Sequence, residues 1–127
     1  MNISQAAKAS GLPTKTVRYY ADIGLVKSNG RSDAGYRTYA DPEIRKLVFV
    51  RRAREFGFSI DECRGLLGLY EDQGRSSADV KQIASKRLEE IEEKQRELQS
   101  LHDELAHLVK ACRGDNRPDC PIIDYFG

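Results

Sequence analysis

The apolar residues at the start of the chain recur at helical spacing and are interrupted by turn-forming residues. They predict a first short helix over 2–11, stopped by Gly11, and a second over 14–24, stopped by Gly24. Thr14, which follows the turn, is the expected N-cap of the second helix, and Val17, Tyr20 and Ile23 fall on its buried side. Two short helices joined by a tight turn are typical of a helix-turn-helix.

The helical period is lost over 25–39, where turn residues alternate with short strand-like pieces, and this pattern predicts a β-hairpin wing. Beyond the wing, Asp41 is the expected N-cap of a third helix. Ser59 and Glu62 form a capping box that opens a fourth helix. A winged helix-turn-helix domain is therefore expected over 1–70.

A single long helix is expected next, because no Pro or Gly interrupts residues 77–113 after a polar linker over 71–76. Its residues fall into two heptad registers that are apolar at both ends and contain two basic residues in the middle. The first register is Ser77, Ala84, Ile91, Leu98, Leu105 and Cys112, and the second is Val80, Arg87, Lys94, Leu101 and Leu108. A helix this polar on its other faces is not stable alone. The chain has no second long helix to cover it, so we expect a second copy of the protein as the partner.

Charge is distributed unevenly along the chain. Residues 1–60 carry eleven Lys and Arg against five Asp and Glu, whereas residues 61–127 carry ten against fifteen. A basic half predicts contact with a polyanion such as double-stranded DNA. The residues expected to make this contact lie on the outer face of the second helix and in the wing: Lys15, Thr16, Arg18, Tyr19, Arg31, Tyr36 and Arg37.

Composition narrows the class of protein further. The 127 residues allow one small domain plus an extended element. No apolar run approaches the roughly 20 residues of a membrane span, and the N-terminus lacks the apolar core of a signal peptide. Three cysteines, an odd number, suit a reducing compartment better than a disulfide framework. No catalytic motif is present. We expect a soluble cytoplasmic protein that is not an enzyme.

Two of the cysteines, Cys112 and Cys120, bracket a seven-residue loop rich in turn-forming residues. Zn²⁺ normally takes four nitrogen or sulfur ligands, and this loop offers two thiolates and no histidine. Soft monovalent ions accept thiolates readily, and two sulfurs suffice for linear coordination, so the pair favours Cu(I). A redox-active thiol pair and two unrelated packing cysteines remain open alternatives. Cys63 stands alone on the fourth helix and is expected to be a packing residue.

Antiparallel pairing of two long helices would bring positive charge to the site formed by the two cysteines. If the seam is centred near Lys94, Ser77 of one copy approaches Cys112 of the other. The positive N-terminal end of the partner helix, with Lys81 one turn further in, then faces the anionic pair of thiolates. Ser77 and Lys81 of the partner subunit are therefore expected to surround the ion without binding it.

Several segments together resemble the MerR family of bacterial transcription regulators over nearly the whole chain. They are Ile3 to Leu12, Thr16-Val17-Arg18-Tyr19-Tyr20, Gly24-Leu25, Gly35-Tyr36-Arg37-Thr38-Tyr39 and Phe56-Gly57-Phe58-Ser59. The segment from Cys112 through Cys120-Pro121-Ile122-Ile123 is similar to the copper-efflux regulators of this family, of the CueR and HmrR type. Ser77 resembles their serine at the position where the zinc and mercury sensors carry a cysteine.

The resemblance implies a mainly α-helical homodimer. Each copy has a winged helix-turn-helix, a long antiparallel coiled-coil dimerisation helix, and a short metal-binding C-terminal loop and tail over 112–127. The dimer is expected to bind a palindromic operator inside a promoter. It would activate copper-efflux and detoxification genes by distorting the DNA when Cu(I) is bound, with Ag(I) and Au(I) as mimics, so that RNA polymerase can use the promoter.

Three rival functions differ in the chemistry of the C-terminal part. A thiol redox sensor on the same scaffold would form a Cys112–Cys120 disulfide. A polyamine- or drug-binding regulator is disfavoured because no ligand domain follows the long helix. An iron–sulfur sensor is disfavoured because a cluster usually needs four cysteines.

Overall fold

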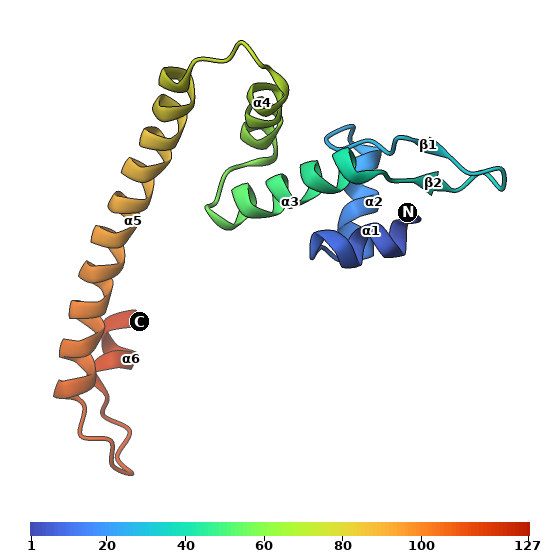
Figure 1. The fold of residues 1–127 in the computed structure, drawn as a ribbon. Helices are drawn as coiled ribbons and strands as arrows, with labels where there is room; N and C mark the ends of the chain where they lie inside the picture. Colours follow the sequence, from blue (N-terminus) through green and yellow to red (C-terminus); the bar gives the residue numbers. More distant parts are fainter. The chain divides into compact units, whose positions relative to one another are not determined.

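The structure is a computed structural model that describes residues 1–127. It is mainly helical, as expected, with one small sheet (Figure 1). In chain order the elements are α1 Ile3–Ser10, α2 Thr14–Asp22, β1 Gly30–Arg31, β2 Arg37–Thr38, α3 Asp41–Glu55, α4 Ile60–Glu71, α5 Ser77–Ala111 and α6 Pro121–Phe126. The chain divides into two compact units, Met1–Lys81 and Gln82–Gly127, named here the N-terminal unit and the C-terminal unit.

Helices α1 and α2 form the helix-turn-helix pair. The Asn2 side chain accepts the Gln5 N–H at 2.8 Å, and the Gln5 side chain accepts the Asn2 N–H at 2.9 Å. Gly11 ends α1 in the left-handed conformation, at a φ of 77°. For α2 the predicted N-cap is wrong by one residue, since Thr14 is already helical and Pro13 holds the cap position. The cause is the Pro13 carbonyl, which accepts the first N–H groups of the helix.

Helices α3 and α4 complete the N-terminal unit. Asp41 was the expected N-cap of α3, but it is the first helical residue and Ala40 caps the helix. The Glu43 carboxylate reaches back to the Ala40 N–H at 3.2 Å, which places the boundary one residue earlier. The capping box of α4 is confirmed: the Ser59 hydroxyl accepts the Glu62 N–H at 3.1 Å, and the Glu62 carboxylate accepts the Ser59 N–H at 2.9 Å.

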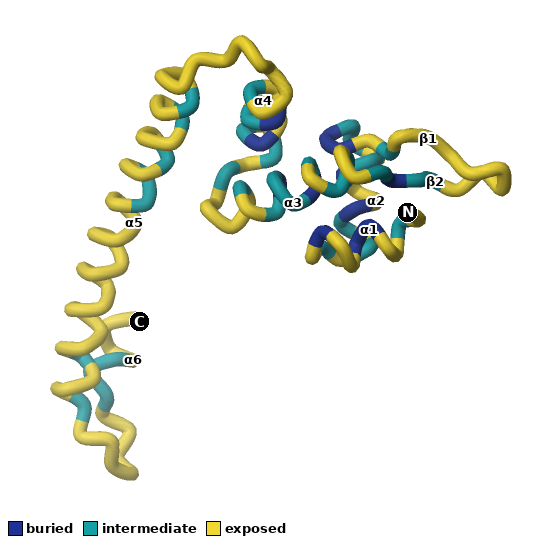
Figure 2. The backbone as a smooth tube through the Cα atoms, in the orientation of Figure 1, coloured by how far each residue is buried: buried dark blue, intermediate teal, exposed yellow.

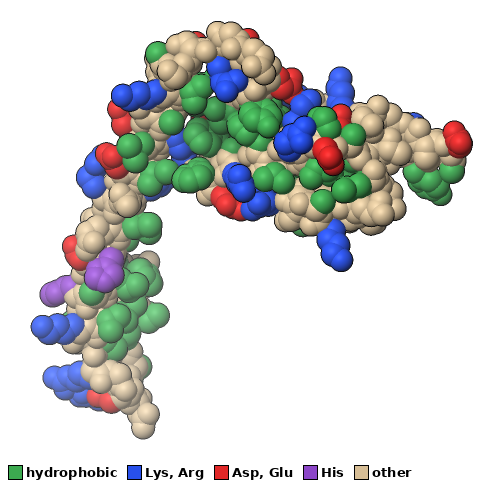
Figure 3. Space-filling model, viewed as in Figure 1, with side chains coloured by type: hydrophobic (Ala, Val, Ile, Leu, Met, Phe, Trp, Pro, Cys, Tyr) green, Lys and Arg blue, Asp and Glu red, His purple; other side chains and the backbone are tan.

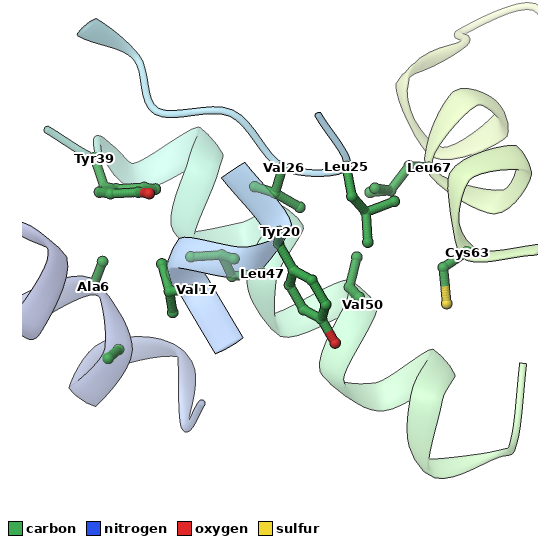
Figure 4. Close-up of a cluster of buried hydrophobic side chains, with 11 residues drawn as sticks. Ala6, Val17, Tyr20, Leu25, Val26, Tyr39, Leu47, Val50, Cys63 and Leu67 are labelled. Atoms are coloured by element: carbon green, nitrogen blue, oxygen red, sulfur yellow. The ribbon is translucent and has the colours of Figure 1, made fainter. Parts of the chain in front are cut away.

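The hydrophobic core lies where α1 to α4 and the base of the wing meet (Figure 4). Its members are Ala6, Ala7, Val17, Tyr20, Leu25, Val26, Tyr39, Leu47, Val50, Cys63 and Leu67. Val17 and Tyr20 come from the inner face of α2, as the sequence predicts. Figure 2 shows buried residues only in the N-terminal unit. This core is what fixes the outer face of α2 in place.

The wing is the antiparallel pair β1 and β2, with Arg31 opposite Arg37. Gly35 turns the chain at a φ of 84°, and its N–H donates to the Ser32 carbonyl at 2.8 Å. Tyr39 follows β2 and is buried in the core, so it anchors the base of the wing.

Helix α5 has 35 residues, and none of its side chains is buried. It begins at Ser77 and ends at Ala111, two residues before the predicted end. The Cys112 N–H still donates to the Leu108 carbonyl at 3.1 Å, but the left-handed Gly114 then leads the chain out of the helix. Its large exposed apolar residues are Leu88, Leu98, Leu101, Leu105 and Val109.

The tail forms a short helix, α6, which the sequence predicts only as apolar residues able to pack on the helix end. Tyr125 and Phe126 line an apolar cavity of about 230 Å³ together with three leucines of α5. The Tyr125 hydroxyl also donates to the Glu104 carboxylate. Figure 3 shows hydrophobic side chains gathered over the C-terminal half of α5 and α6. The tail thus contacts α5, but Tyr125 and Phe126 both stay more than half exposed, so the predicted packing is only partial. None of the helices combines the length and apolar character that a bilayer crossing requires.

Candidate DNA-binding face and dithiol site

The outer face of α2 presents the side chains that the sequence predicts for DNA contact. Lys15, Arg18 and Tyr19 are exposed, while Thr16 is half-buried. The first turn of α2 contains no acidic residue. The positive end of the helix dipole is therefore not neutralised from within the helix, which favours a phosphate near it.

The wing holds its three predicted residues in different ways. Tyr36 is 73% exposed. Arg31 donates from Nη1 to the Gly35 carbonyl at 2.8 Å, inside the wing. Arg37 pairs with Asp22 at the end of α2, with Nη2 and Oδ1 2.8 Å apart. Sequence reasoning missed this pair because its members lie on different elements, fifteen positions apart.

A cavity of about 630 Å³ lies between the first turn of α1, helix α2 and the wing. Arg18, Arg31 and Arg37 line it with Tyr36, and Asp22 is the one carboxylate in the lining. Three guanidinium groups around one hollow make a surface that attracts phosphate. The structure thus brings four of the predicted residues together, whereas the other three, all on α2, lie outside this cavity.

Other cations of the basic half are engaged within the protein. Arg51 donates from Nε to the Ser10 carbonyl at 2.9 Å, which ties α3 to the end of α1. Arg54 donates from Nη1 to the Phe58 carbonyl at 2.7 Å. Counting the positive charges of this half therefore gives too many side chains that face a polyanion. Only the fold shows which cations bond within the protein and which do not.

Cys112 and Cys120 bring their thiols together in the C-terminal unit. Their Sγ atoms are 3.6 Å apart, and both residues are partly buried. Cys112 follows the last residue of α5, and Cys120 is the N-cap of α6. The Ile123 N–H, then the Cys112 thiol and the Ile122 N–H, lower the pKa of the Cys120 thiol. Nowhere in the chain do three or more His, Cys, Asp or Glu side chains gather in a way that suits a metal ion.

The loop between the two cysteines is shaped by Asp115. Its carboxylate accepts three bonds from Arg117: the backbone N–H at 2.9 Å, Nε at 3.0 Å and Nη2 at 2.8 Å. The Arg117 side chain is the main cause of the lowered pKa of Asp115, and its backbone N–H adds to it. Asp115 is thus occupied within the loop, and sequence analysis missed this clamp although Asp commonly bonds to a backbone N–H two residues on.

The two residues predicted to come from a partner subunit lie at the start of α5. Ser77 is its first residue and Lys81 lies one turn further on, and both are exposed. Within one chain, Ser77 lies 35 positions before Cys112 in the sequence.

Cys63 is a packing residue, as expected. Its side chain is fully buried in the core of the N-terminal unit. Burial raises the pKa of the Cys63 thiol, and the Arg54 guanidinium opposes this only in part.

The winged helix-turn-helix and its basic cavity define a DNA-binding protein, and the long exposed helix with a dithiol loop distinguishes it among such proteins. The family model described as MerR HTH family regulatory protein matches residues 1–69, and the model described as MerR, DNA binding, matches residues 44–108. The chain belongs to the MerR family of transcription regulators, and it is not an enzyme.

Similar proteins cover nearly the full chain. The HTH-type transcriptional regulator HmrR of Rhizobium leguminosarum bv. viciae is 55% identical over 124 residues, which are 98% of this chain and 95% of that protein. The HTH-type transcriptional regulator CueR of Salmonella typhimurium is 46% identical over 124 residues, covering 98% and 90%. The crystal structure of the transcription regulator PbrR691 from Ralstonia metallidurans CH34, in complex with lead(II), has a TM-score of 0.82 and 28% identity, covering 100% of this chain and 99% of that one.

Proposed function

We propose that this protein is a transcriptional activator that responds to Cu(I), and to Ag(I) and Au(I) as mimics, and that it activates promoters of copper efflux and detoxification. The observation that carries the proposal is the 3.6 Å approach of the Cys112 and Cys120 sulfurs, with no third ligating side chain beside them in the chain. The similarity to proteins named CueR and HmrR supports it.

Cys112 and Cys120 would hold the ion as two thiolates. Cu(I) is soft and monovalent, and when bound it supplies a bond between the end of α5 and the start of α6. Zn²⁺ normally takes four ligands in proteins, and the chain offers two here. The donor set therefore fits a singly charged soft ion better than zinc.

A homodimer would complete the surroundings of the ion. Helix α5 leaves large apolar residues exposed along its length, and a second copy of the same helix, running antiparallel as a coiled coil, covers them. This pairing brings Ser77 and Lys81 of one copy towards Cys112 of the other. The charge of Lys81 and the positive end of the partner helix then offset the negative charge of a bis-thiolate bound to a monovalent ion.

Each copy would present α2 and the wing to one half-site of a palindromic operator in promoter DNA. Metal binding needs a preference of only about 1–3 kcal/mol for one dimer conformation to change how the two DNA-binding units hold the DNA. Because promoter DNA is deformable, it changes shape in response, and RNA polymerase then uses the promoter. We place this activity in the cytoplasm, where thiols stay reduced.

Anaerobic Cu(I) titration in the presence of a reductant tests the proposal. The wild-type dimer takes up one Cu(I) per chain, and Cys112→Ser loses both this uptake and metal-dependent transcription from the promoter. Cys63→Ala is the matched control, because this third thiol lies in the core, and it keeps both properties. Full activation by Cys112→Ser would refute the proposal.

A thiol redox sensor is a second candidate, and the 3.6 Å distance between the same sulfurs favours it too. In that reaction two thiols give up two protons and two electrons to hydrogen peroxide, which leaves one disulfide and two waters. Peroxide would then activate transcription in the absence of metal. Activation by Cu(I) under reducing conditions, with none by peroxide, decides against this candidate.

A further inference from the structure

The C-terminal end of α2 lacks a positive charge of its own. The helix ends at Asp22, and no basic residue occupies its last turn. A helix C-terminus carries a partial negative charge, so an acidic residue there is unfavourable unless cations from elsewhere compensate. Helix α2, which is proposed to contact base edges, thus needs cations from other elements to compensate the negative charge at its C-terminal end.

Two arginines from other elements supply these charges. Arg37 of β2 pairs with Asp22. Arg64 of α4 reaches the carbonyls that follow the helix: Nη1 donates to the Gly24 carbonyl and Nη2 to the Ile23 carbonyl, both at 3.3 Å. A guanidinium that bonds two successive carbonyls with two of its nitrogens fixes direction as well as charge.

The neighbours of Arg64 on α4 show why it is aimed at this point. Cys63 and Leu67 are buried in the core, and Figure 4 shows Leu67 beside Leu25, just after the end of α2. The core therefore fixes the turn of α4 on which Arg64 stands. The guanidinium group remains on the exposed side, where it links α4 to the end of α2.

We propose that Arg64 is a positioning residue for DNA recognition. It holds the C-terminal end of α2 through the Ile23 and Gly24 carbonyls, and so sets the angle at which the outer face of α2 meets DNA. Two of its N–H donors are directed at these carbonyls, and in this role it acts through the position of α2 and not as a phosphate ligand. This inference rests on the proposed role of α2 in reading an operator.

Operator binding over a series of salt concentrations tests the proposal. The probe is a fluorescent DNA duplex selected from a random library by the wild-type protein. Arg64→Ala is expected to weaken binding about two- to fivefold, the range that the loss of a charge at a helix end gives. The slope of log affinity against log salt stays at the wild-type value, because no phosphate contact is lost. Arg64→Lys keeps the charge and recovers at least half of the loss.

Arg75 provides a matched control. It donates from Nη1 to carbonyls at the end of α4, among them that of Asp72 at 3.0 Å, and α4 carries none of the residues predicted to contact DNA. Arg75→Ala is expected to leave operator affinity within about twofold of the wild type. Thermal unfolding of each variant shows that binding is measured on folded protein, and Arg64→Lys carries the test if Arg64→Ala is unfolded.

Three results would overturn the proposal: unchanged affinity in Arg64→Ala, a salt slope that falls by about one as it does for a phosphate contact, or no recovery in Arg64→Lys. Failure of the wild-type protein to select any duplex is a different outcome. It would refute the proposed function itself.

Discussion

The two units of this protein contrast in how they are stabilised. The N-terminal unit has a core of eleven buried apolar residues, whereas the C-terminal unit buries none. A small domain with such a core can fold within one chain, but a long helix whose apolar residues stay exposed needs a partner. DNA recognition therefore belongs to a rigid unit, while the proposed metal response belongs to the part whose structure depends on assembly.

A matched pair of leucines gives the largest expected effect. Leu47 is fully buried and Leu98 is 65% exposed. Leu47→Ala is expected to cost the N-terminal unit about 2–5 kcal/mol, because a cavity forms in a packed core. Leu98→Ala leaves the unfolding of this unit unchanged. Denaturant unfolding at fixed protein concentration compares them, and equal losses in both variants would remove the contrast.

The same substitution of Leu98 should act on assembly instead. In the proposed antiparallel register each copy of Leu98 would face the partner subunit, so the dimer would lose two contacts at once. We expect the dimer dissociation constant to rise about tenfold or more. Sedimentation across a dilution series measures it, with Ser100→Ala, which lies outside both heptad registers, as control. A dimer unaffected by Leu98→Ala would place the interface elsewhere.

The basic cavity gives a smaller effect, confined to the N-terminal unit. Arg18→Ala is expected to lower the slope of log affinity against log salt by about one, with several-fold weaker operator binding. Arg37→Ala lowers it less, because Asp22 already neutralises part of this charge. Copper affinity stays unchanged in both. Lys86→Ala, on α5, is the control for charge alone, and an intact slope in Arg18→Ala would contradict the assignment of this face.

The smallest expected effect concerns the packing of α6 on α5. Tyr125→Phe removes the hydroxyl that donates to Glu104 but keeps the ring in the apolar cavity. We expect a Cu(I) chelator to remove the ion about two- to threefold faster, since one exposed hydrogen bond contributes modestly. Tyr36→Phe, in the other unit, is the matched control. Equal rates in all three proteins would show that the hydroxyl does not support the loop.

Local signals predicted much of the fold. The capping box at Ser59 and the inward position of Tyr20 depend on residues within one helix, and the structure confirms both. The N-caps at Thr14 and Asp41 were each placed one residue late, because a backbone carbonyl or a Glu side chain satisfied the helix start without them. The helical form of the tail was missed, since six residues give too short a period to recognise.

The sequence did not predict the ion pairs and hydrogen bonds that side chains form between different elements. The sequence predicts that Arg37 faces DNA, which stays a prediction, and the fold shows that Arg37 pairs with Asp22. Arg51 and Arg54 counted towards the basic half, yet both serve backbone carbonyls inside the N-terminal unit. The sequence gives the net charge of a segment, but only the tertiary structure shows which of its charges are already paired. The role of Cys112 as a metal ligand stays a prediction, supported by its approach to a second sulfur.

X-ray absorption of the copper-loaded dimer tests the central claim most directly, because the spectrum reports the oxidation state of copper and the number of coordinating atoms. The proposed site predicts Cu(I) with two sulfur neighbours and no nitrogen or oxygen ligand, and the same result in Cys63→Ala. A four-coordinate spectrum, or one that contains light-atom ligands, would contradict it.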